Sequence, residues 1–190
     1  MVELEGLNLL HIRNATVGKQ EAFSGKVILE GYNPLWPVIF MGEADKVNAA
    51  LGDAALQIHH VGSTSVLGLC AKPIIDILLV VADSSDESSY VPALESVGYT
   101  LHIREPDWYQ HRLLKGCRPD VNLHVFSEGA TEIKRMLQFR DWLRSNNDDK
   151  LLYENIKREL AERTWGHVQQ YADAKTDIIN EIMARSTTKK

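Results

Sequence analysis

The chain has 190 residues, enough to bury a hydrophobic core in one domain or in one domain with a helical addition. Hydrophobic residues make up 44% and charged residues 25%, and the net charge of −5 gives no sign of the basic face that binds duplex nucleic acid. Two cysteines cannot form a disulfide framework, and neither a signal peptide nor a membrane-spanning apolar run is found. We therefore expect a cytoplasmic protein that binds neither duplex nucleic acid nor membranes.

The N-terminal part of the chain predicts a helix followed by a strand, a loop and a second strand. Residues 1–27 contain several turn formers, and we interpret them as an N-terminal extension, either a short hairpin or a flexible arm. Apolar residues spaced three and four apart predict a helix that runs to Leu51 and ends at Gly52. Leu56–Val61 then predicts a strand, and a loop leads from it into the next strand, Ile74–Ala82.

The strand Ile74–Ala82 is apolar on both faces apart from Asp76, which is typical of a strand in the middle of a covered sheet. A polar loop follows it, then a short helix that ends before a glycine and three strands separated by turn residues. These predicted elements are Tyr90–Val97 for the helix and Tyr99–Arg104, Trp108–Lys115 and Val121–Phe126 for the strands.

The rest of the chain predicts helices, because its apolar residues recur at spacings of three and four. The three predicted helices include Ile133–Leu143, Leu152–Leu160 and Val168–Met183. The elements together predict an α/β (α+β) fold, with a mixed central sheet, helices on both faces and additional C-terminal helices. We expect residues 28–130 to form the core and residues 131–185 to form a helical part packed on it.

The turn Gly62-Ser63-Thr64 at the end of a predicted strand is a candidate phosphate-binding segment. Glycine lets the backbone turn sharply and lets a phosphate approach, while the N–H and hydroxyl groups that follow can donate to phosphate oxygens. The same three residues are also ordinary turn chemistry, and they are not a Walker A loop.

Asp76 is a second candidate, because a carboxylate in an apolar strand is costly unless it is paired or binds a metal ion. The alternative is a structural aspartate that Lys72, Arg112 or backbone amides satisfy. Lys72 could instead neutralise a phosphate at the entrance of the strand, and Arg112 could contact a phosphate or simply face solvent. His124 could act as a base or a ligand, or could be a hydrogen-bonded structural histidine.

The sequence resembles the GrpB family, which belongs to the nucleotidyltransferase-like proteins of the polymerase-beta-type superfamily. The segment HHVGSTSVLGLCAKPIIDILLVV is similar to the family's central block, and GYNPLWPVIF, VNLHVF and MLQFRDWLRSN are similar to flanking motifs. The resemblance extends from about Gly31 to Met183. It implies a nucleotidyltransferase-like core in which Gly62, Ser63 and Thr64 hold nucleotide phosphates and Asp76 holds Mg²⁺ for nucleotidyl transfer.

One departure from that pattern bears directly on the metal site. The superfamily places a second carboxylate two residues after the first, where this chain has Leu78. Three functions therefore stay open: metal-dependent nucleotidyl transfer from a nucleoside triphosphate, with Asp76 and His124 as candidate catalytic residues; non-catalytic binding of a nucleotide or another phosphate-bearing small molecule, with a degenerate metal site; and protein interaction. The oligomeric state cannot be deduced from the sequence.

Overall fold

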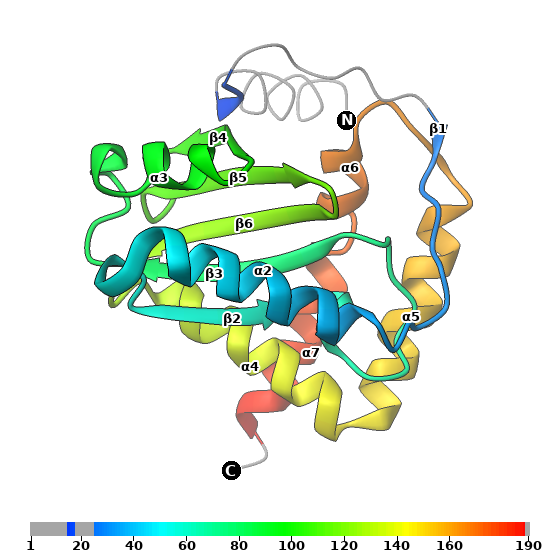
Figure 1. Cartoon of the computed structure of the whole chain (residues 1–190). Helices are drawn as coiled ribbons and strands as arrows, with labels where there is room; N and C mark the ends of the chain where they lie inside the picture. The colour runs from blue at the N-terminus through cyan, green and yellow to red at the C-terminus, as the bar shows by residue number, and fades with distance from the viewer. Residues whose placement is uncertain (1–14, 18–24, 189–190) are drawn as a thin grey trace.

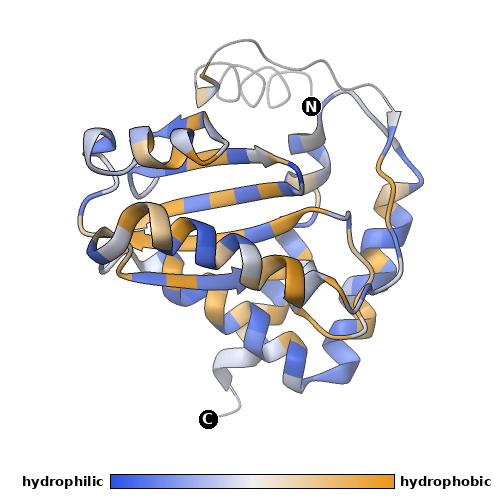
Figure 2. Cartoon of the chain, in the orientation of Figure 1, coloured by the Kyte–Doolittle hydropathy of each residue, from blue (hydrophilic) through white to orange (hydrophobic). Residues whose placement is uncertain are grey.

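The computed structural model describes residues 15–17 and 25–188, and its centre is a five-stranded mixed sheet in the order β2-β3-β6-β5-β4 (Figure 1). The strands are β2 (Gln57–Val61), β3 (Ile75–Val81), β4 (Tyr99–Glu105), β5 (His111–Cys117) and β6 (Asp120–Ser127). β3 and β6 pair in parallel and the other neighbours pair antiparallel. The polar-apolar alternation of a half-buried strand is visible along β6 (Figure 2).

Helices cover both faces of this sheet, as the sequence predicted. Helices α2 (Trp36–Leu51) and α3 (Val91–Ser96) pack against Ile75, Ile77 and Leu79 of β3. Helix α4 (Thr131–Ser145) packs against the opposite face, which carries Leu78 and Val80. Because β3 lies between two layers, its side chains are buried on both faces, which explains its apolar composition.

The remaining helices surround one end of the sheet. They are α5 (Asn147–Ala161), α6 (Val168–Asp173) and α7 (Thr176–Thr188), and α6 lies beside the ends of β5 and β6 (Figure 1). A second core joins α4, α5 and α7 to the loop after β2 through Val66, Leu69, Leu143, Tyr153 and Ile182. Among the residues described, no helix is long and apolar enough to cross a membrane.

The prediction of one continuous helix over Val168–Met183 is wrong, because the structure divides this segment into α6 and α7. At the break the Lys175 N–H donates to the carbonyl of Ala172, three residues back, instead of four. The apolar spacing continues across the break, so periodicity alone did not reveal it. The turn places Lys175 beside the Tyr171 ring, with the ammonium 4.7 Å from the ring centre.

The strand predicted from Trp108 also begins later, at His111. Tyr109 and Gln110 have φ of 53° and 54°, a left-handed conformation that cannot continue a strand. Much of the predicted N-terminal extension lies outside the described residues. Of the part that is described, Gly25–Lys26 forms β1, which pairs with β7 (Thr164–Trp165), and Val17 donates its N–H to the His102 carbonyl at 2.8 Å.

Candidate functional site

The glycine turn and Asp76 lie together at the end of the sheet where β2 ends and β3 begins. Val61 pairs with Asp76 across the two strands, and Ser63–Ser65 follow as a single 3₁₀ turn. Gly62 has φ of +67°, and a Cβ built on it would lie 2.2 Å from Asp76 Oδ2. Only glycine fits at this position, because any side chain would collide with the carboxylate and strain the backbone.

Asp76 is contacted from β6, the strand on its other side. Asn122 donates from Nδ2 to Asp76 Oδ1 at 2.9 Å, and His124 Nε2 lies 3.9 Å from the same oxygen. Burial raises the pKa of Asp76, but the interactions with His124 and Asn122 and the charge of Lys72 outweigh it and hold the pKa below its usual range. Asp76 is therefore a carboxylate at neutral pH, with 28% of its side chain exposed.

Three lysines gather around this carboxylate and the turn. Lys157 on α5 is 2% exposed, and its ammonium donates to Ser63 Oγ at 3.0 Å and to the Cys70 carbonyl. Lys72 and Lys175 extend over the ring of Tyr171, at 5.8 and 4.7 Å from its centre.

The lysines lie close enough to one another to repel. Burial, together with the charge of Lys175, lowers the pKa of Lys157 to about 8. Burial and the charge of Lys175 also lower the pKa of Lys72. Burial lowers the pKa of Lys175 as well. The negative charge of Asp76 raises the pKa of Lys72 and of Lys175 and so opposes the effect of burial. We call Lys72, Lys157 and Lys175 the lysine cluster.

Two tyrosines stand among these lysines. The Tyr153 hydroxyl interacts with Ser63, and burial raises the pKa of Tyr153 above its usual value. Tyr171 is 1% exposed, and its hydroxyl has no hydrogen-bond partner within the described part of the chain. A buried donor without a partner is costly, so the hydroxyl is a further group that a bound polar molecule could satisfy.

The candidate residue Thr64 has a structural contact instead of an open hydroxyl. Thr64 is 1% exposed, and its Oγ1 lies 3.0 Å from His60 Nε2. His60 stacks on Phe40 at 4.6 Å, and burial lowers the pKa of His60 to about 4. Thr64 therefore shapes the turn, and of the two hydroxyls only that of Ser63 faces the lysine cluster.

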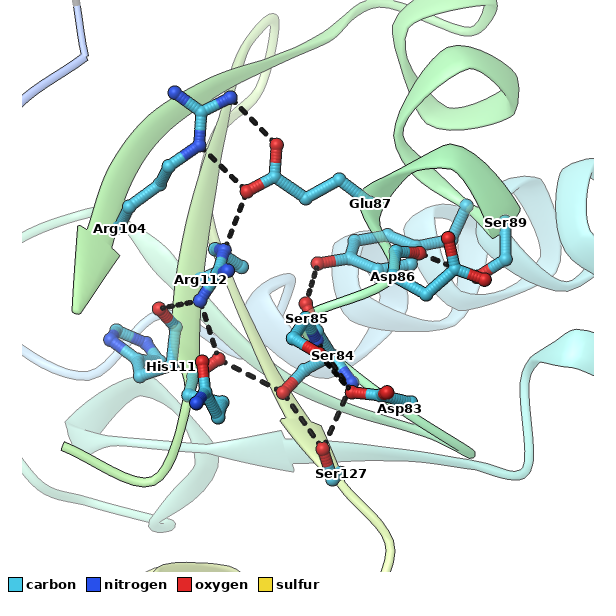
Figure 3. A network of polar contacts seen from close by, with 12 residues as sticks. Asp83, Ser84, Ser85, Asp86, Glu87, Ser89, Arg104, His111, Arg112 and Ser127 are labelled. Atoms are coloured by element: carbon cyan, nitrogen blue, oxygen red, sulfur yellow. Dashed lines mark hydrogen bonds and ion pairs between the residues drawn. The ribbon is translucent and has the colours of Figure 1, made fainter. Parts of the chain in front are cut away.

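Arg112 is the sequence candidate that the structure does not bring to the site. It pairs with Val125 across β5 and β6 and shares the face of Leu79, opposite to Asp76. Arg112 Nε donates to Glu87 at 2.7 Å, and Arg104 holds the same carboxylate through two contacts of 2.6 Å (Figure 3). The prediction of a phosphate contact by Arg112 is wrong, because which face of the sheet it occupies depends on a strand register that the sequence does not state.

The network around Glu87 is structural. Hydrogen bonds from Arg104 and Arg112 lower the pKa of Glu87 to about 2, against the opposing effect of burial. Ser84 is buried and contacts the Gln110 carbonyl and Ser127 Oγ, each at 2.9 Å (Figure 3). These contacts hold the loop after β3 to the start of β5 and the end of β6, away from the glycine turn.

The donor set around Asp76 does not fit a centre of two metal ions. Leu78, on the same face two residues later, is fully buried against α4 and supplies no ligand. Within the described residues, no group of three histidine, cysteine, aspartate or glutamate side chains could hold a metal ion. Mg²⁺ prefers several carboxylate or phosphate oxygens, whereas the charged neighbours of Asp76 are lysines.

Lys157, Lys175, Tyr153 and Tyr171 are site residues that the sequence analysis did not identify as such. They come from the C-terminal helices and from the turn between α6 and α7, about a hundred residues after the glycine turn, and nothing local marks them as neighbours of Ser63. One signal was available: a lysine on the mostly apolar face that includes Tyr153 and Leu160 is out of place unless it is paired.

Comparisons with known proteins agree with the fold. The GrpB protein family matches residues 26–185 of the chain. A UPF0157 protein from Halalkalibacterium halodurans is 58% identical over 92% of this chain and 90% of that protein. A UPF0157 protein from Streptomyces coelicolor is 42% identical over 90% and 88%. The crystal structure of a conserved protein GrpB from Enterococcus faecalis is similar with a TM-score of 0.73 and 30% identity, covering 85% of this chain and 98% of that one. This chain therefore belongs to the GrpB family.

Proposed function

We propose that the chain binds a phosphate-bearing small molecule, such as a nucleotide, between the glycine turn and the lysine cluster. The observation that carries this proposal is the imbalance of charge at the site. Lys72, Lys157 and Lys175 lie around a single carboxylate, Asp76, which acts electrostatically on two of them. A phosphate carries two negative charges near neutral pH and would balance the remaining lysines.

Other carboxylates near the cluster do not remove this imbalance. Glu154 faces the region of Cys70 but is held by Arg158 at 2.6 Å. Asp173 acts on Lys175, and Lys115 adds a further positive charge that acts on Lys72. Buried like charges cost free energy, and the cost is recovered when an anion accepts their hydrogen bonds.

Nucleotidyl transfer is the second candidate, and the glycine turn supports it. The close approach of Gly62 to Asp76 is the arrangement expected where a phosphate and a metal ion share one site. Leu78 argues against it, since a buried leucine stands where a metal pair requires a carboxylate. We therefore propose Mg²⁺ only as a companion of nucleotide phosphates, and binding without transfer as the function.

The test is a ligand panel measured by thermal unfolding and by isothermal titration. The panel contains inorganic phosphate, pyrophosphate, AMP, ADP and ATP, each with and without Mg²⁺. We expect phosphate-bearing compounds to stabilise the wild type by RT ln(1 + [L]/Kd). A Lys175→Met variant should lose the effect, and a Lys134→Met variant should keep it, because Lys134 is an exposed residue of α4 away from the cluster.

Product analysis with each triphosphate then separates the two candidates. Release of pyrophosphate that depends on Asp76 would favour transfer over simple binding. If no compound of the panel stabilises the wild type at millimolar concentration, the phosphate proposal is wrong and the protein-interaction function becomes the better one.

A further inference from the structure

The hydroxyl of Ser63 is held between a lysine and a tyrosine at an accessible point of the glycine turn. Lys157 Nζ lies 3.0 Å from Ser63 Oγ, and the Tyr153 hydroxyl interacts with the same side chain. Ser63 is half-buried, whereas Gly62 directly before it is exposed and has φ of +67°. A ligand on the open side of the turn can therefore reach the serine oxygen.

Lys157 is placed to take a proton from this hydroxyl. Its side chain is buried, and its nitrogen also donates to the backbone carbonyl of Cys70, which fixes the direction of the amine. A neutral amine keeps an N–H for that carbonyl and presents its lone pair to Ser63. A nucleophile and a base within hydrogen-bond reach, with the base oriented by a third group, form the arrangement that activates a serine.

The surroundings of Lys157 make the neutral amine accessible near pH 7. Burial and the charges of Lys175 and Arg158 lower the pKa of Lys157 to about 8, while Cys70 and Glu154 act in the opposite direction. About one amine in ten is then neutral at pH 7, compared with roughly one in three thousand for an ordinary lysine. The buried lysine can thus act as a base at a pH where an exposed lysine cannot.

The other two lysines of the cluster determine which electrophile fits. Lys175 acts electrostatically on both Lys157 and Lys72, so the three side chains share one small region. Positive charge there attracts an anionic electrophile and stabilises a leaving group that departs as an anion. An uncharged ester would use only the second effect, whereas a phosphoanhydride would use both.

We propose that Ser63 is a nucleophile that accepts the phosphoryl group of a bound phosphoanhydride, such as an acyl phosphate, with Lys157 as its general base. The inference rests on the phosphate site proposed above and adds a covalent step to binding. The step differs from nucleotidyl transfer, because the acceptor is a serine of the protein itself and the transferred group is a phosphoryl group.

The step balances in atoms and electrons. Ser63 Oγ forms a bond to phosphorus, the bond from phosphorus to the bridging oxygen breaks, and the leaving group departs with that electron pair. The hydroxyl proton moves to Lys157 Nζ, which becomes an ammonium. The products are phosphoserine at position 63 and a free carboxylate or phosphate.

Diisopropyl fluorophosphate tests the nucleophile independently of the phosphate site, because this probe carries no charge for the lysines to bind. We expect intact mass spectrometry to show one added diisopropylphosphoryl group and peptide mapping to place it on Ser63. Ser63→Ala should stay unlabelled. Lys157→Met should be labelled at least about a hundredfold more slowly, the typical contribution of a general base, and Lys134→Met should match the wild type.

The pH profile and a charge-preserving variant separate a base from a lysine that only holds the turn. The labelling rate of the wild type should rise about tenfold per pH unit up to pH 7 and level off above pH 8, as the amine loses its proton. Lys157→Arg keeps a positive charge but cannot accept a proton at these pH values, so it should be labelled as slowly as Lys157→Met. Labelling of Lys157→Arg at the wild-type rate would overturn the inference.

Acetyl phosphate tests the ligand class. Wild type should release acetate and, after an acid quench, carry one phosphoryl group on Ser63, whereas Ser63→Ala should carry none. If pyrophosphate stabilises the wild type but neither reagent labels Ser63, the nucleophile is wrong and the phosphate site stands. If the fluorophosphate labels Ser63 and acetyl phosphate does not, the phosphoryl step is wrong. If pyrophosphate does not bind, the phosphate site itself is wrong, even where the uncharged probe labels Ser63.

Discussion

Replacing Lys157 by methionine tests the balance between stability and binding at the site. Burial lowers the pKa of Lys157 from 10.5 to about 8, and each pKa unit corresponds to about 1.4 kcal/mol. Below pH 8 the folded state therefore carries a cost on the order of 3 kcal/mol for this ammonium, and the cost disappears as the pH rises from 8 to 10.5. Methionine has a similar length and no charge, so it removes the cost.

The substitution also removes the donor that satisfies Ser63 Oγ and the Cys70 carbonyl. The two unsatisfied acceptors together cost about 2–6 kcal/mol, which is comparable to the gain. We expect the free energy of unfolding at pH 7 to change by no more than about 3 kcal/mol. We expect affinity for pyrophosphate to fall roughly ten- to a hundredfold, the loss of one charge-assisted hydrogen bond.

Urea unfolding at pH 7 and pH 10 measures the first expectation, and isothermal titration with pyrophosphate measures the second. Wild type should gain stability relative to the variant as the pH rises from 8 to 10, because only the wild type loses the buried charge. Lys134→Met should change neither quantity by much. A variant that unfolds far more easily but binds pyrophosphate normally would refute the reasoning.

Three further predictions concern other residues of the sheet. Gly62→Ala should abolish pyrophosphate binding and lower the melting temperature, since its Cβ would lie 2.2 Å from Asp76 Oδ2; normal titration curves would contradict the glycine-turn site. Arg112→Met should destabilise the protein by about 1–3 kcal/mol in urea unfolding, because a partly buried Glu87 loses one of its two arginine partners and keeps Arg104, but pyrophosphate affinity should be unchanged. In titrations with MgCl₂, the wild type should show weak or no Mg²⁺ binding without ATP. Leu78→Asp should raise Mg²⁺ affinity at some cost in stability, and Asp76→Asn should remove any Mg²⁺ dependence of ATP binding; tight Mg²⁺ binding by the wild type alone would count against the binder function.

The sheet and its order of elements were largely predictable because their signals are local. A strand that is apolar on both faces belongs in the middle of a sheet, and β3 lies between β2 and β6. The approach of Gly62 to Asp76 was also predictable, since adjacent strands joined by a short loop bring those two positions to one end. The late start of β5 was not predictable. Tyr109 and Gln110 adopt a left-handed conformation, but neither is a glycine or an asparagine, the residue types that would indicate it in a sequence.

The lysine cluster was not predictable for a different reason. Lys157 and Lys175 reach Ser63 and Tyr171 only after α5, α6 and α7 have packed at the end of the sheet. Arg112 is the opposite case. The sequence offered it as a site residue, but in the structure it lies on the face of the sheet opposite to Asp76. A shift of one residue in the pairing of β5 with β6 would have turned it toward Asp76, and the sequence alone does not determine such a register.

The charges around Asp76 bear on how this fold is used here. A carboxylate that holds metal ions is normally accompanied by other carboxylates, because a concentrated negative field attracts the cation. Asp76 instead stabilises the protonated forms of Lys72 and Lys175, whose pKa values burial would lower further without it. In that role the carboxylate keeps the lysine cluster charged, and Leu78 is compatible with it because no second acidic group is required. An aspartate beside a glycine turn is thus compatible with the proposed binding of a phosphate, whereas nucleotidyl transfer would need a second carboxylate to hold a pair of metal ions.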